Sequence, residues 1–413
     1  MNRDLKRWGL IIFLAAAALR VGWVAWSWHQ TGATLSYPDE ELHWQLARNL
    51  VEKGSLVTDD GRYAARMPLY PLFLTPFALS VDHGIIFARI AQTLISAATV
   101  LLIYRFVRTQ FGKPPALLAA GLATLDPFSI FFTNLLLTES VFILFGVALT
   151  VCAWPHLRDP QTTRIRTTIG VGVFGAAAIL TRPSAAGWIG LLWIILWLYD
   201  RDRRRATLRT ALYACTLVIG LLPWGIRNQR LLGAYAWLSA NGGVTLYDAQ
   251  GPQADGGSNQ QFVKDLAALA ELNEIERDTK LRDLAWQQMR ENRARVIKLA
   301  WTKFRRMWNL VPNVAEYRAG AAALASAVFT AGVLVLTLTA LCRFYRQRQK
   351  MVRQNQRLYL LLFLPVLYFT LLHCVFIGSV RYRVPLMPFL EIAAGTLLIA
   401  SSTASRDSSI ADS

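Results

Sequence analysis

The chain has 413 residues, of which 54% are hydrophobic, and it carries a formal net charge of +18 at pH 7. This composition is too apolar for an ordinary soluble domain, and the basic residues fall in short clusters between apolar runs, which argues against a nucleic-acid-binding face. The four cysteines lie in apolar stretches without CxxC or Cys/His spacing, so we expect neither a zinc site nor a disulfide framework. The sequence predicts an all-α polytopic membrane protein.

Ten apolar segments approach the length of about 20 residues that a membrane-spanning helix needs. They are residues 9–28, 84–106, 115–132, 135–154, 167–181, 184–199, 210–226, 319–342, 358–377 and 384–402. The first segment follows a charged N-terminus, and no small-residue cleavage site closes it. We therefore expect an uncleaved first span.

The basic clusters between these segments predict the orientation. If the N-terminus is cytoplasmic, the inside segments hold about 21 of the 44 Lys and Arg residues, as the positive-inside rule requires. The chain then divides into residues 1–226 with seven spans and an outer loop at 29–83, an outer loop at 227–318, and residues 319–413 with three spans and a cytoplasmic tail. We expect a multi-pass inner-membrane protein whose functional face is the outer one.

Isolated charges near the span ends fall on this outer side. An ionisable group at membrane depth costs about 2.5 to 3.5 kcal/mol on insertion scales, so such a group usually has a partner or a function. These groups either satisfy one another or hold a substrate that carries phosphate and hydroxyl groups. The candidates are Asp39, Glu40, Arg66, Glu139, Arg182, Arg227, Arg381 and Arg383.

Asp39 is the first of these in chain order. Ser36 and Pro38 open a helix in SYPDEELHWQL, and Ser36 with Asp39 has the spacing of a capping box, which is the ordinary explanation for such a carboxylate. The functional explanation uses the same geometry. The first helical turn would fix Asp39 and Glu40 at the outer face, where one carboxylate acts as general base on an acceptor hydroxyl.

The outer cations at span ends are all arginines. Arginine binds phosphate oxygens with two parallel hydrogen bonds, and a phosphate leaving group departs as an anion without a general acid. Snorkelling side chains are the alternative explanation for about half of them. Glu139 either pairs with an arginine or shares a divalent cation with Asp39, although two carboxylates without further ligands do not predict a metal site. The five histidines show no metal-ligand spacing.

The outer loop at 227–318 ends in a basic, aromatic helix near residues 292–310. Val296, Ala300, Phe304 and Trp308 form one stripe, and the basic residues lie elsewhere on the helix. This pattern predicts a helix that either lies on the anionic membrane surface or packs on the rest of the loop.

The order of these motifs resembles the GT-C glycosyltransferases, especially bacterial members of glycosyltransferase family 39 and their relatives among protein O-mannosyltransferases and aminoarabinose transferases. The resemblance rests on PDEELHWQLARNL, RMPLYPLFL, LTES, TRPSA, WGIRN, NGGVTLYDA and RYRVPLMP in this order. It implies inverting transfer of one sugar from a polyprenyl-phosphate carrier at the outer face of a bacterial inner membrane. No cofactor is firmly implied, although a divalent cation is possible.

The resemblance also implies roles for individual residues. Asp39 would be the general base with Glu40 beside it, and Arg66 with Arg381 or Arg383 would bind the carrier phosphate. The cavity would be lined by Glu139, Arg182, Arg227, Tyr70, Tyr382 and His373. The long loop of about 90 residues leaves no room for the large outer sensor domain of the protein mannosyltransferases, which argues against a protein acceptor. The acceptor is expected to be a lipid, a glycan or a protein.

A transporter or flippase of a lipid-linked sugar is the main alternative, because it too needs an outer cationic cavity and many spans. The spans show no internal repeat, and no ionisable residue stands convincingly at mid-membrane depth, which argues against it. A non-catalytic assembly subunit is a third possibility. Such a subunit would tolerate the loss of Asp39, whereas an enzyme would not.

Overall fold

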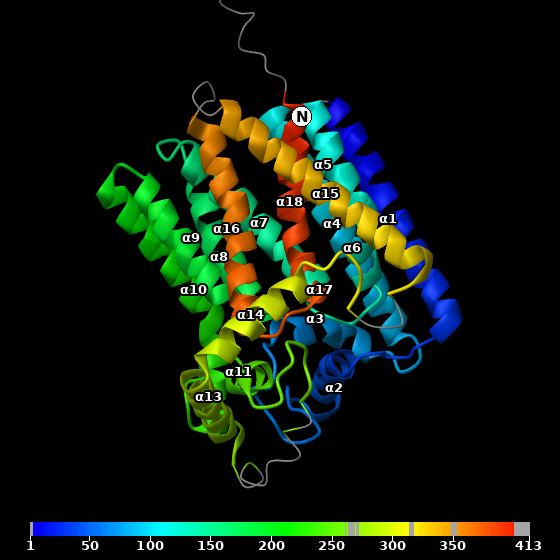
Figure 1. Ribbon diagram of the computed structural model, residues 1–413, viewed down its shortest axis with the longest axis vertical. Helices are drawn as coiled ribbons and strands as arrows, with labels where there is room; N and C mark the ends of the chain where they lie inside the picture. Colours follow the sequence, from blue (N-terminus) through cyan, green and yellow to red (C-terminus); the bar gives the residue numbers. More distant parts are fainter. Residues whose placement is uncertain are drawn as a thin grey trace, which may run out of the picture.

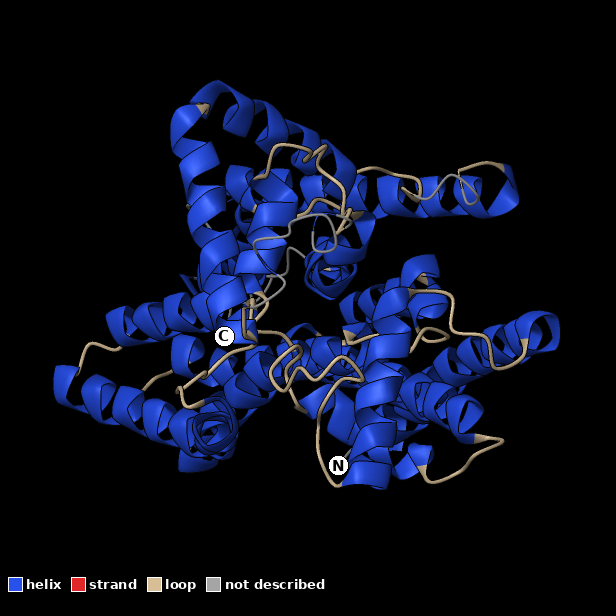
Figure 2. Cartoon of the chain, turned by 90° about the horizontal axis from the view of Figure 1, so that it is seen from below, coloured by secondary structure: helices blue, strands red, loops and turns tan. Residues whose placement is uncertain are grey.

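The computed structural model describes residues 3–260, 262, 269, 272–313, 318–347 and 353–399. Long helices run side by side in a bundle, and short helices gather at one end of it, the lower end in Figure 1. We call this the loop end; it carries α2 (Pro38–Lys53), α11 (Gly242–Gln250) and α13 (Glu274–Glu291). Figure 2 looks onto the loop end and shows that the regular elements of the described chain are helices.

Six helices in the described part of the chain are long and apolar enough to cross a membrane. They are α1 (Arg3–Thr31), α4 (Gly84–Phe111), α7 (Glu139–Arg158), α10 (Arg203–Leu232), α15 (Gly320–Gln347) and α16 (Arg353–Val375). Shorter helices complete the structure. They are α3 (Leu69–Ala78), α5 (Lys113–Leu125), α6 (Pro127–Phe132), α8 (Ile165–Thr181), α9 (Ala185–Tyr199), α14 (Arg293–Met307), α17 (Val380–Arg383) and α18 (Met387–Gly395), with 3-10 turns at Val384–Leu386 and Thr396–Leu398.

Each of the ten predicted apolar segments overlaps at least one helix, so the prediction of an all-α, multi-pass membrane protein is confirmed. The helix α7 lies at the centre of the bundle, and 67% of the residues in its most apolar stretch are buried. It packs on α4, α8, α9 and α16. Its buried surface includes Trp154, which stands edge-on to Phe106 of α4. The apolar residues around α7 therefore form the core on which the loop end is built.

The prediction of one continuous helix over residues 115–132 is wrong, because α5 ends and α6 begins around Asp126. The Asp126 carboxylate accepts a hydrogen bond from the backbone amide two residues later, at 3.0 Å, and so caps α6. Arg20 of α1 donates to the carbonyls of Ala123, at 2.9 Å, and Thr124, at 3.2 Å, at the end of α5. Lipid offers no such partners, so a helix break in a membrane requires them from the protein.

Arg20 also corrects the expectation that the spans hold no interior charge. The Arg20 side chain, on α1, is fully buried in the protein, and the Glu391 side chain, on α18, is buried too. The Arg20 guanidinium also donates to Ser96 of α4, at 2.8 Å, and to the carbonyl of Ala16, at 3.2 Å. Because these groups and the α5 carbonyls use its donors, the contacts of Arg20 indicate a structural role at the helix break.

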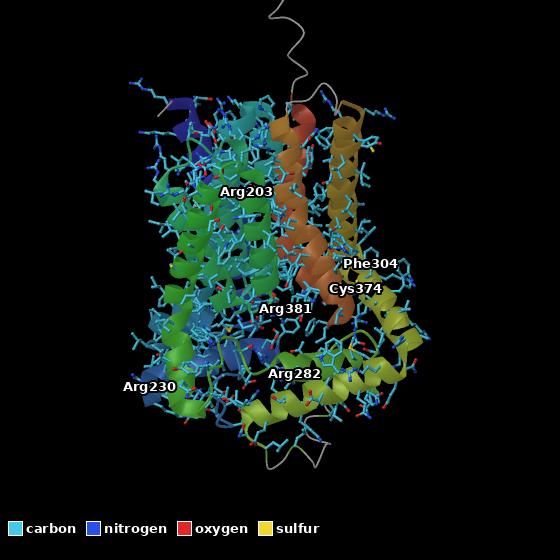
Figure 3. All side chains as sticks on the ribbon, turned by 90° about the vertical axis from the view of Figure 1, so that its left-hand side faces the viewer. Arg203, Arg230, Arg282, Phe304, Cys374 and Arg381 are labelled. Atoms are coloured by element: carbon cyan, nitrogen blue, oxygen red, sulfur yellow. The ribbon has the colours of Figure 1, made fainter. Side chains whose placement is uncertain are left out.

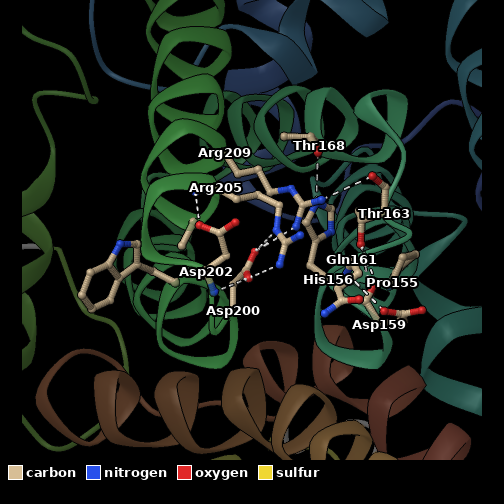
Figure 4. Close-up of polar contacts among 12 residues, drawn as sticks. Pro155, His156, Asp159, Gln161, Thr163, Thr168, Asp200, Asp202, Arg205 and Arg209 are labelled. Atoms are coloured by element: carbon tan, nitrogen blue, oxygen red, sulfur yellow. Dashed lines mark hydrogen bonds and ion pairs between the residues drawn. The ribbon is translucent and has the colours of Figure 1, made fainter.

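A second group of charges lies at the opposite end of the bundle from the loop end. Figure 4 shows Asp200, between α9 and α10, accepting hydrogen bonds from Arg205, at 2.8 Å, and Arg209, at 3.0 Å. Nearby, a ring nitrogen of His156 lies 3.1 Å from the Thr168 hydroxyl and links α7 to α8. These contacts tie together the ends of four helices.

The helix α10 connects the two ends of the bundle. Figure 3 shows Arg203 in its upper part and Arg230 at the level of the loop end. The RDRRR cluster, predicted to be cytoplasmic, thus stands at one end, and the residues predicted to be outer stand at the other.

Candidate active site

The first turn of α2 holds three consecutive carboxylates, Asp39, Glu40 and Glu41, and Glu40 is the one that caps the helix. Glu40 accepts hydrogen bonds from the backbone amides of Ser36, at 2.9 Å, and Tyr37, at 3.1 Å. It also accepts one from the amide of Leu136, at 2.8 Å, in the segment before α7. The predicted capping box between Ser36 and Asp39 is therefore wrong, and Asp39 is not used as a cap.

Glu40 is fully buried, and its three amide partners join the start of α2 to the start of α7. Burial raises the pKa of Glu40, and the amide hydrogen bonds oppose that rise. With its carboxylate turned to the backbone, Glu40 positions the helix on which Asp39 stands. This geometry argues against the predicted role of Glu40 as a catalytic partner of Asp39.

Asp39 lies between two arginines. Its Oδ1 accepts a hydrogen bond from Nη2 of Arg66, at 2.7 Å, and its Oδ2 accepts one from Nη1 of Arg381, at 2.6 Å. Burial raises the pKa of Asp39, but the positive charges of Arg66 and Arg381 outweigh it and hold this pKa well below its usual range. The Asp39 side chain is 36% exposed, so its carboxylate can be reached from outside the protein.

Glu139 is the second carboxylate of the site. It stands in the first turn of α7, where the helix dipole favours negative charge. Its Oε1 accepts hydrogen bonds from Nη2 of Arg182 and Nε of Arg381, both at 2.5 Å, and the Arg182 Nε donates to Thr138, at 2.6 Å. Glu139 is fully buried, so Arg381 links a buried carboxylate to an accessible one.

Asp39, Glu139, Arg66, Arg182 and Arg381 form what we call the carboxylate–arginine cluster. Its members come from α2, the segment before α3, α7, the α8–α9 turn and α17. Three guanidinium groups against two carboxylates leave one formal positive charge. A surplus cation beside an accessible carboxylate suits an anionic ligand that carries a reacting group.

Aromatic and histidine side chains lie beside this cluster. Tyr382 stacks on His373, with ring centroids 3.9 Å apart, and the His373 Nδ1 is 2.9 Å from the carbonyl of Ile377. His43 is one turn after Asp39 on α2, and its buried Nδ1 has no hydrogen-bond partner among the described residues. Burial lowers the pKa of His43 to about 3, so its ring is neutral at pH 7.

Three predicted site residues bond to groups outside the cluster. Tyr70 is fully buried, stands edge-on to His43 with ring centroids 4.9 Å apart, and donates to Gln92, at 2.6 Å, so it belongs to the packing of α3 on α2 and α4. Arg227 donates to the carbonyls of Tyr63, at 2.7 Å, and Leu56, at 2.5 Å. Arg227 therefore holds the first loop against α10, and these contacts argue against its predicted place in the cavity.

Arg383 is the third of these residues, and its contacts argue against its predicted role as a phosphate ligand. Its side chain is fully buried over the ring of Phe128, 5.1 Å from the ring centroid, and it donates to the carbonyl of Asn309 and, at 3.4 Å, to Thr330. Of the RYR pair, Arg381 alone contacts the carboxylates. Arg383 anchors α17 from behind.

Two further residues that shape the site were difficult to predict from the sequence. Thr138 accepts the hydrogen bond from Arg182, and only its position before Glu139 in LTES indicates it. Arg89 of α4 donates to the carbonyls of Gly32, at 3.0 Å, and Thr34, at 2.8 Å, and so fixes the chain that leads from α1 to α2. A lone arginine inside a predicted span is the one signal that points to it.

The carboxylate–arginine cluster does not fit a divalent cation. Each of its carboxylates is already held by two arginines, whose charges oppose a metal ion. The described residues contain no group of three or more His, Cys, Asp or Glu side chains placed to hold one. Whether turnover depends on a divalent cation is a question for an activity assay.

Comparisons with known proteins identify the fold. Residues 66–225 match the family model described as dolichyl-phosphate-mannose-protein mannosyltransferase, a stretch that holds Arg66, Glu139 and Arg182. The structure is similar to the archaeal oligosaccharyltransferase AglB from Archaeoglobus fulgidus in complex with an inhibitory peptide and a dolichol-phosphate, with a TM-score of 0.56 and 12% identity over 96% of this chain and 50% of that chain. The apo form gives a TM-score of 0.56 at 12% identity, over 95% of this chain and 51% of that one.

ArnT from Cupriavidus metallidurans, bound to undecaprenyl phosphate, matches with a TM-score of 0.41 and 15% identity over 95% of this chain and 76% of that chain. None of the curated proteins compared matches the sequence. The chain spans about half the length of the oligosaccharyltransferase structures. The family match and the similarity to AglB confirm the predicted GT-C fold and the resemblance to the protein mannosyltransferases.

Proposed function

We propose that this multi-pass GT-C membrane protein transfers a single sugar from a polyprenyl-phosphate carrier to an acceptor hydroxyl at the outer face of a bacterial inner membrane. The observation that carries the proposal is an accessible carboxylate, Asp39, held between two arginines in a cluster with one surplus positive charge. The family match to dolichyl-phosphate-mannose-protein mannosyltransferases and the dolichol-phosphate named in the AglB complex support a lipid-phosphate donor. The orientation rests on the distribution of basic residues.

The donor in this proposal is a phosphodiester with one negative charge. Arg66 and Arg381 each hold one oxygen of Asp39, so the same two guanidinium groups are spaced to take oxygens of a phosphate at this position. Arg182 stays with buried Glu139 and keeps that carboxylate compensated. The formal charge of the site then falls from one positive to neutral when the donor binds.

The reaction joins the acceptor oxygen to the anomeric carbon of the sugar and breaks the bond between that carbon and the carrier phosphate oxygen. The bonding electrons leave on the phosphate, where Arg66 and Arg381 stabilise the developing charge in a site partly shielded from water. The acceptor proton moves to the Asp39 carboxylate, which acts as general base. Attack opposite the leaving group inverts the configuration at the anomeric carbon.

Donor binding also activates the base in this scheme. Two guanidinium groups hold Asp39 at a depressed pKa and make it a weak base while the site is empty of donor. When these groups turn to the donor phosphate, Asp39 loses much of their stabilisation and its pKa rises. The Asp39 carboxylate is therefore a stronger base when the sugar donor is bound beside it.

This activation predicts that the acid limbs of kcat/KM and kcat differ. The kcat/KM profile reports the free enzyme, in which the pKa of Asp39 is well below its usual range, so we expect no acid limb from Asp39 down to about pH 4. The kcat profile reports the donor complex, in which the pKa is higher, so kcat is expected to fall at a higher pH. Steady-state kinetics between pH 4 and 8, with folding checked at each pH, make the comparison. Identical acid limbs would contradict activation by the donor.

Removal of divalent cations is expected to leave turnover unchanged, because arginines occupy the positions around both carboxylates where a metal would bind. Purified protein treated with EDTA, dialysed and assayed with and without added Mg²⁺ or Mn²⁺ provides the measurement. A loss of turnover with EDTA that returns with one of these ions would show that a metal assists the reaction.

The test of the function is transfer of radiolabelled sugar by the purified protein in lipid vesicles, from a panel of polyprenyl-phosphate sugars to a panel of membrane lipids, glycans and peptides. We expect cleavage of the donor and a labelled acceptor product. Movement of intact donor across the vesicle membrane without cleavage would instead establish the transporter or flippase alternative. The panel also identifies the sugar and the acceptor.

A further inference from the structure

The helix α14 lies where the loop end meets the lower part of α16, and its exposed face is apolar. Ile297 is 72% exposed, Trp301 is 61% exposed and Phe304 is 36% exposed, and the rings of Trp301 and Phe304 are stacked, with centroids 5.5 Å apart. Lys298 and Arg305 flank this stripe and are exposed too. The predicted stripe that began at Val296 is therefore rotated, and the real one faces away from the protein.

The opposite face of α14 holds the chain that leads into the active site. Lys303 is fully buried, and its Nζ donates to the carbonyl of Val375 at the end of α16, at 2.7 Å. Gln250 of α11 donates to the same carbonyl, at 2.5 Å, and Arg306 donates to the carbonyl of Gly378, at 3.1 Å. A buried cation at the last carbonyls of a helix stabilises that helix end.

The approach of α14 to this chain is close enough to require a glycine. A Cβ atom at Gly378 would stand 2.5 Å from both the Cα and the carbonyl oxygen of Lys303. Figure 3 places Phe304, Cys374 and Arg381 at neighbouring levels, where α14 crosses the end of α16. The α14 backbone and the start of the Arg381 segment are therefore in direct contact.

The residues after α14 hold the next part of the same segment. Asn313 accepts a hydrogen bond from the amide of Val380, at 2.8 Å, and the carbonyl of Asn309 accepts one from Arg383. Together with Lys303 and Arg306, these contacts fix the chain from the end of α16 through α17. Arg381, which extends from α17 to both carboxylates of the cluster, takes its position from them.

We propose that α14 is an interfacial helix that positions Arg381: its outer stripe lies among anionic lipid headgroups, and Lys303 on its inner face holds the segment that presents Arg381. The inference rests on the proposed function and makes Lys303 a positioning residue. Seating α14 in the membrane surface sets the height of α17 relative to α2. Arg381 therefore meets Asp39 and the donor phosphate only when the helix is seated.

A lipid surface is the occupant that the contacts favour. The helix packs on α16, which is long and apolar enough to span a membrane, so the edge of the bilayer lies beside it. Exposed aromatic rings flanked by Lys298 and Arg305 match an interface where acyl chains meet anionic headgroups. Burying Arg305 and Lys298 against a protein partner would require matching acidic groups as well as an apolar groove.

The first experiment measures the contact with lipid, without turnover. Wild type and Trp301→Phe are placed in vesicles of phosphatidylglycerol with brominated acyl chains, and the quenching of tryptophan fluorescence is compared. We expect brominated lipid to quench Trp301 in the wild type. The quenched part of the tryptophan fluorescence should therefore be smaller in Trp301→Phe. Trp286→Phe is the matched control, because Trp286 is 47% exposed on α13 and should contribute no such component. Equal quenching in wild type and Trp301→Phe would overturn the lipid assignment.

The second experiment measures the link to Arg381. Lys303→Met is expected to lower kcat/KM for the donor at least tenfold with the acceptor KM unchanged, and Lys303→Arg is expected to restore most of it. Lys280→Met, an exposed position on α13, is the control. An equal fall in kcat/KM for the donor and for the acceptor would show that Lys303 has only a general structural role. A folded Lys303→Arg protein without restored kcat/KM for the donor would show the same.

A double change of Ile297 and Phe304 to Glu, which keeps Trp301 as the fluorescent reporter, tests the two parts together. We expect it to abolish bromolipid quenching at α14 and to lower the donor kcat/KM as Lys303→Met does. If α14 leaves the lipid and donor kinetics stay at the wild-type level, the proposed coupling is wrong. If wild type itself shows no transfer while Trp301 is quenched, the proposed function fails and the lipid contact stands.

Discussion

Asp39→Asn is expected to lower kcat for sugar transfer by about 10²- to 10⁴-fold, the usual contribution of a general base. The amide keeps the shape of the carboxylate but cannot take the acceptor proton. The change also removes the negative charge that competes for Arg66 and Arg381, so the donor phosphate should bind more tightly. We therefore expect KM for the donor to fall together with kcat, a combination that loss of folding does not produce.

The measurement is radiolabelled sugar transfer with donor titration for both proteins, with monodispersity and thermal unfolding compared. Asp59→Asn is the control, because Asp59 lies in the same loop, is 49% exposed and bonds to Lys53 away from the cluster. Turnover of Asp39→Asn at the wild-type rate would remove Asp39 as the base. It would favour a transporter or a non-catalytic assembly subunit.

Arg381→Gln is expected to lower kcat/KM for the donor by about 10²- to 10³-fold, as for the loss of one donor to a developing negative charge. Among the described residues, Arg381 alone contacts both carboxylates of the cluster, so its loss leaves buried Glu139 with Arg182 as its remaining ion-pair partner there. Breaking a buried pair costs about 3 to 5 kcal/mol in general, so we expect a lower unfolding temperature as well. Arg381→Lys should not restore activity, because one ammonium group cannot replace two guanidinium nitrogens that reach different carboxylates.

Measurements of donor binding distinguish the loss of the phosphate contact from the loss of protein stability in Arg381→Gln. Isotherms with polyprenyl phosphate below the unfolding temperature should show weaker binding for Arg381→Gln, in contrast to the tighter binding expected for Asp39→Asn. Arg48→Gln is the control, since Arg48 is an exposed arginine whose ion pair with Glu52 is 3.9 Å long. Unchanged donor binding and turnover in a folded Arg381→Gln protein would remove Arg381 from the phosphate site.

The helices could be predicted because lipid leaves the backbone no other choice. An apolar run must satisfy its hydrogen bonds internally, so each predicted segment forms helix. The break at Asp126 was harder, since Pro127 also suits the first turn of a helix. Whether the chain breaks there depends on Arg20, which lies about a hundred residues away and donates to the freed carbonyls.

The site could be predicted as a set of charges near span ends but not residue by residue. Neighbouring positions on a helix point about 100° apart, so the sequence places Asp39 and Glu40 together while the structure turns one outward and the other to the backbone. Arg381 and Arg383 are two apart on α17 and face nearly opposite directions for the same reason. Which of each pair faces the site is decided by packing between distant segments.

The contacts of Arg381 also order events during biosynthesis. Arg381 follows Glu139 by 242 residues and Asp39 by 342. A chain that has emerged only through α10 contains two carboxylates and two arginines of the cluster and is neutral there. The surplus positive charge arrives with α17, among the last segments to leave the ribosome. In a nascent chain the cluster is thus neutral, and its attraction for the proposed lipid-phosphate donor arises only when the last spans enter the membrane.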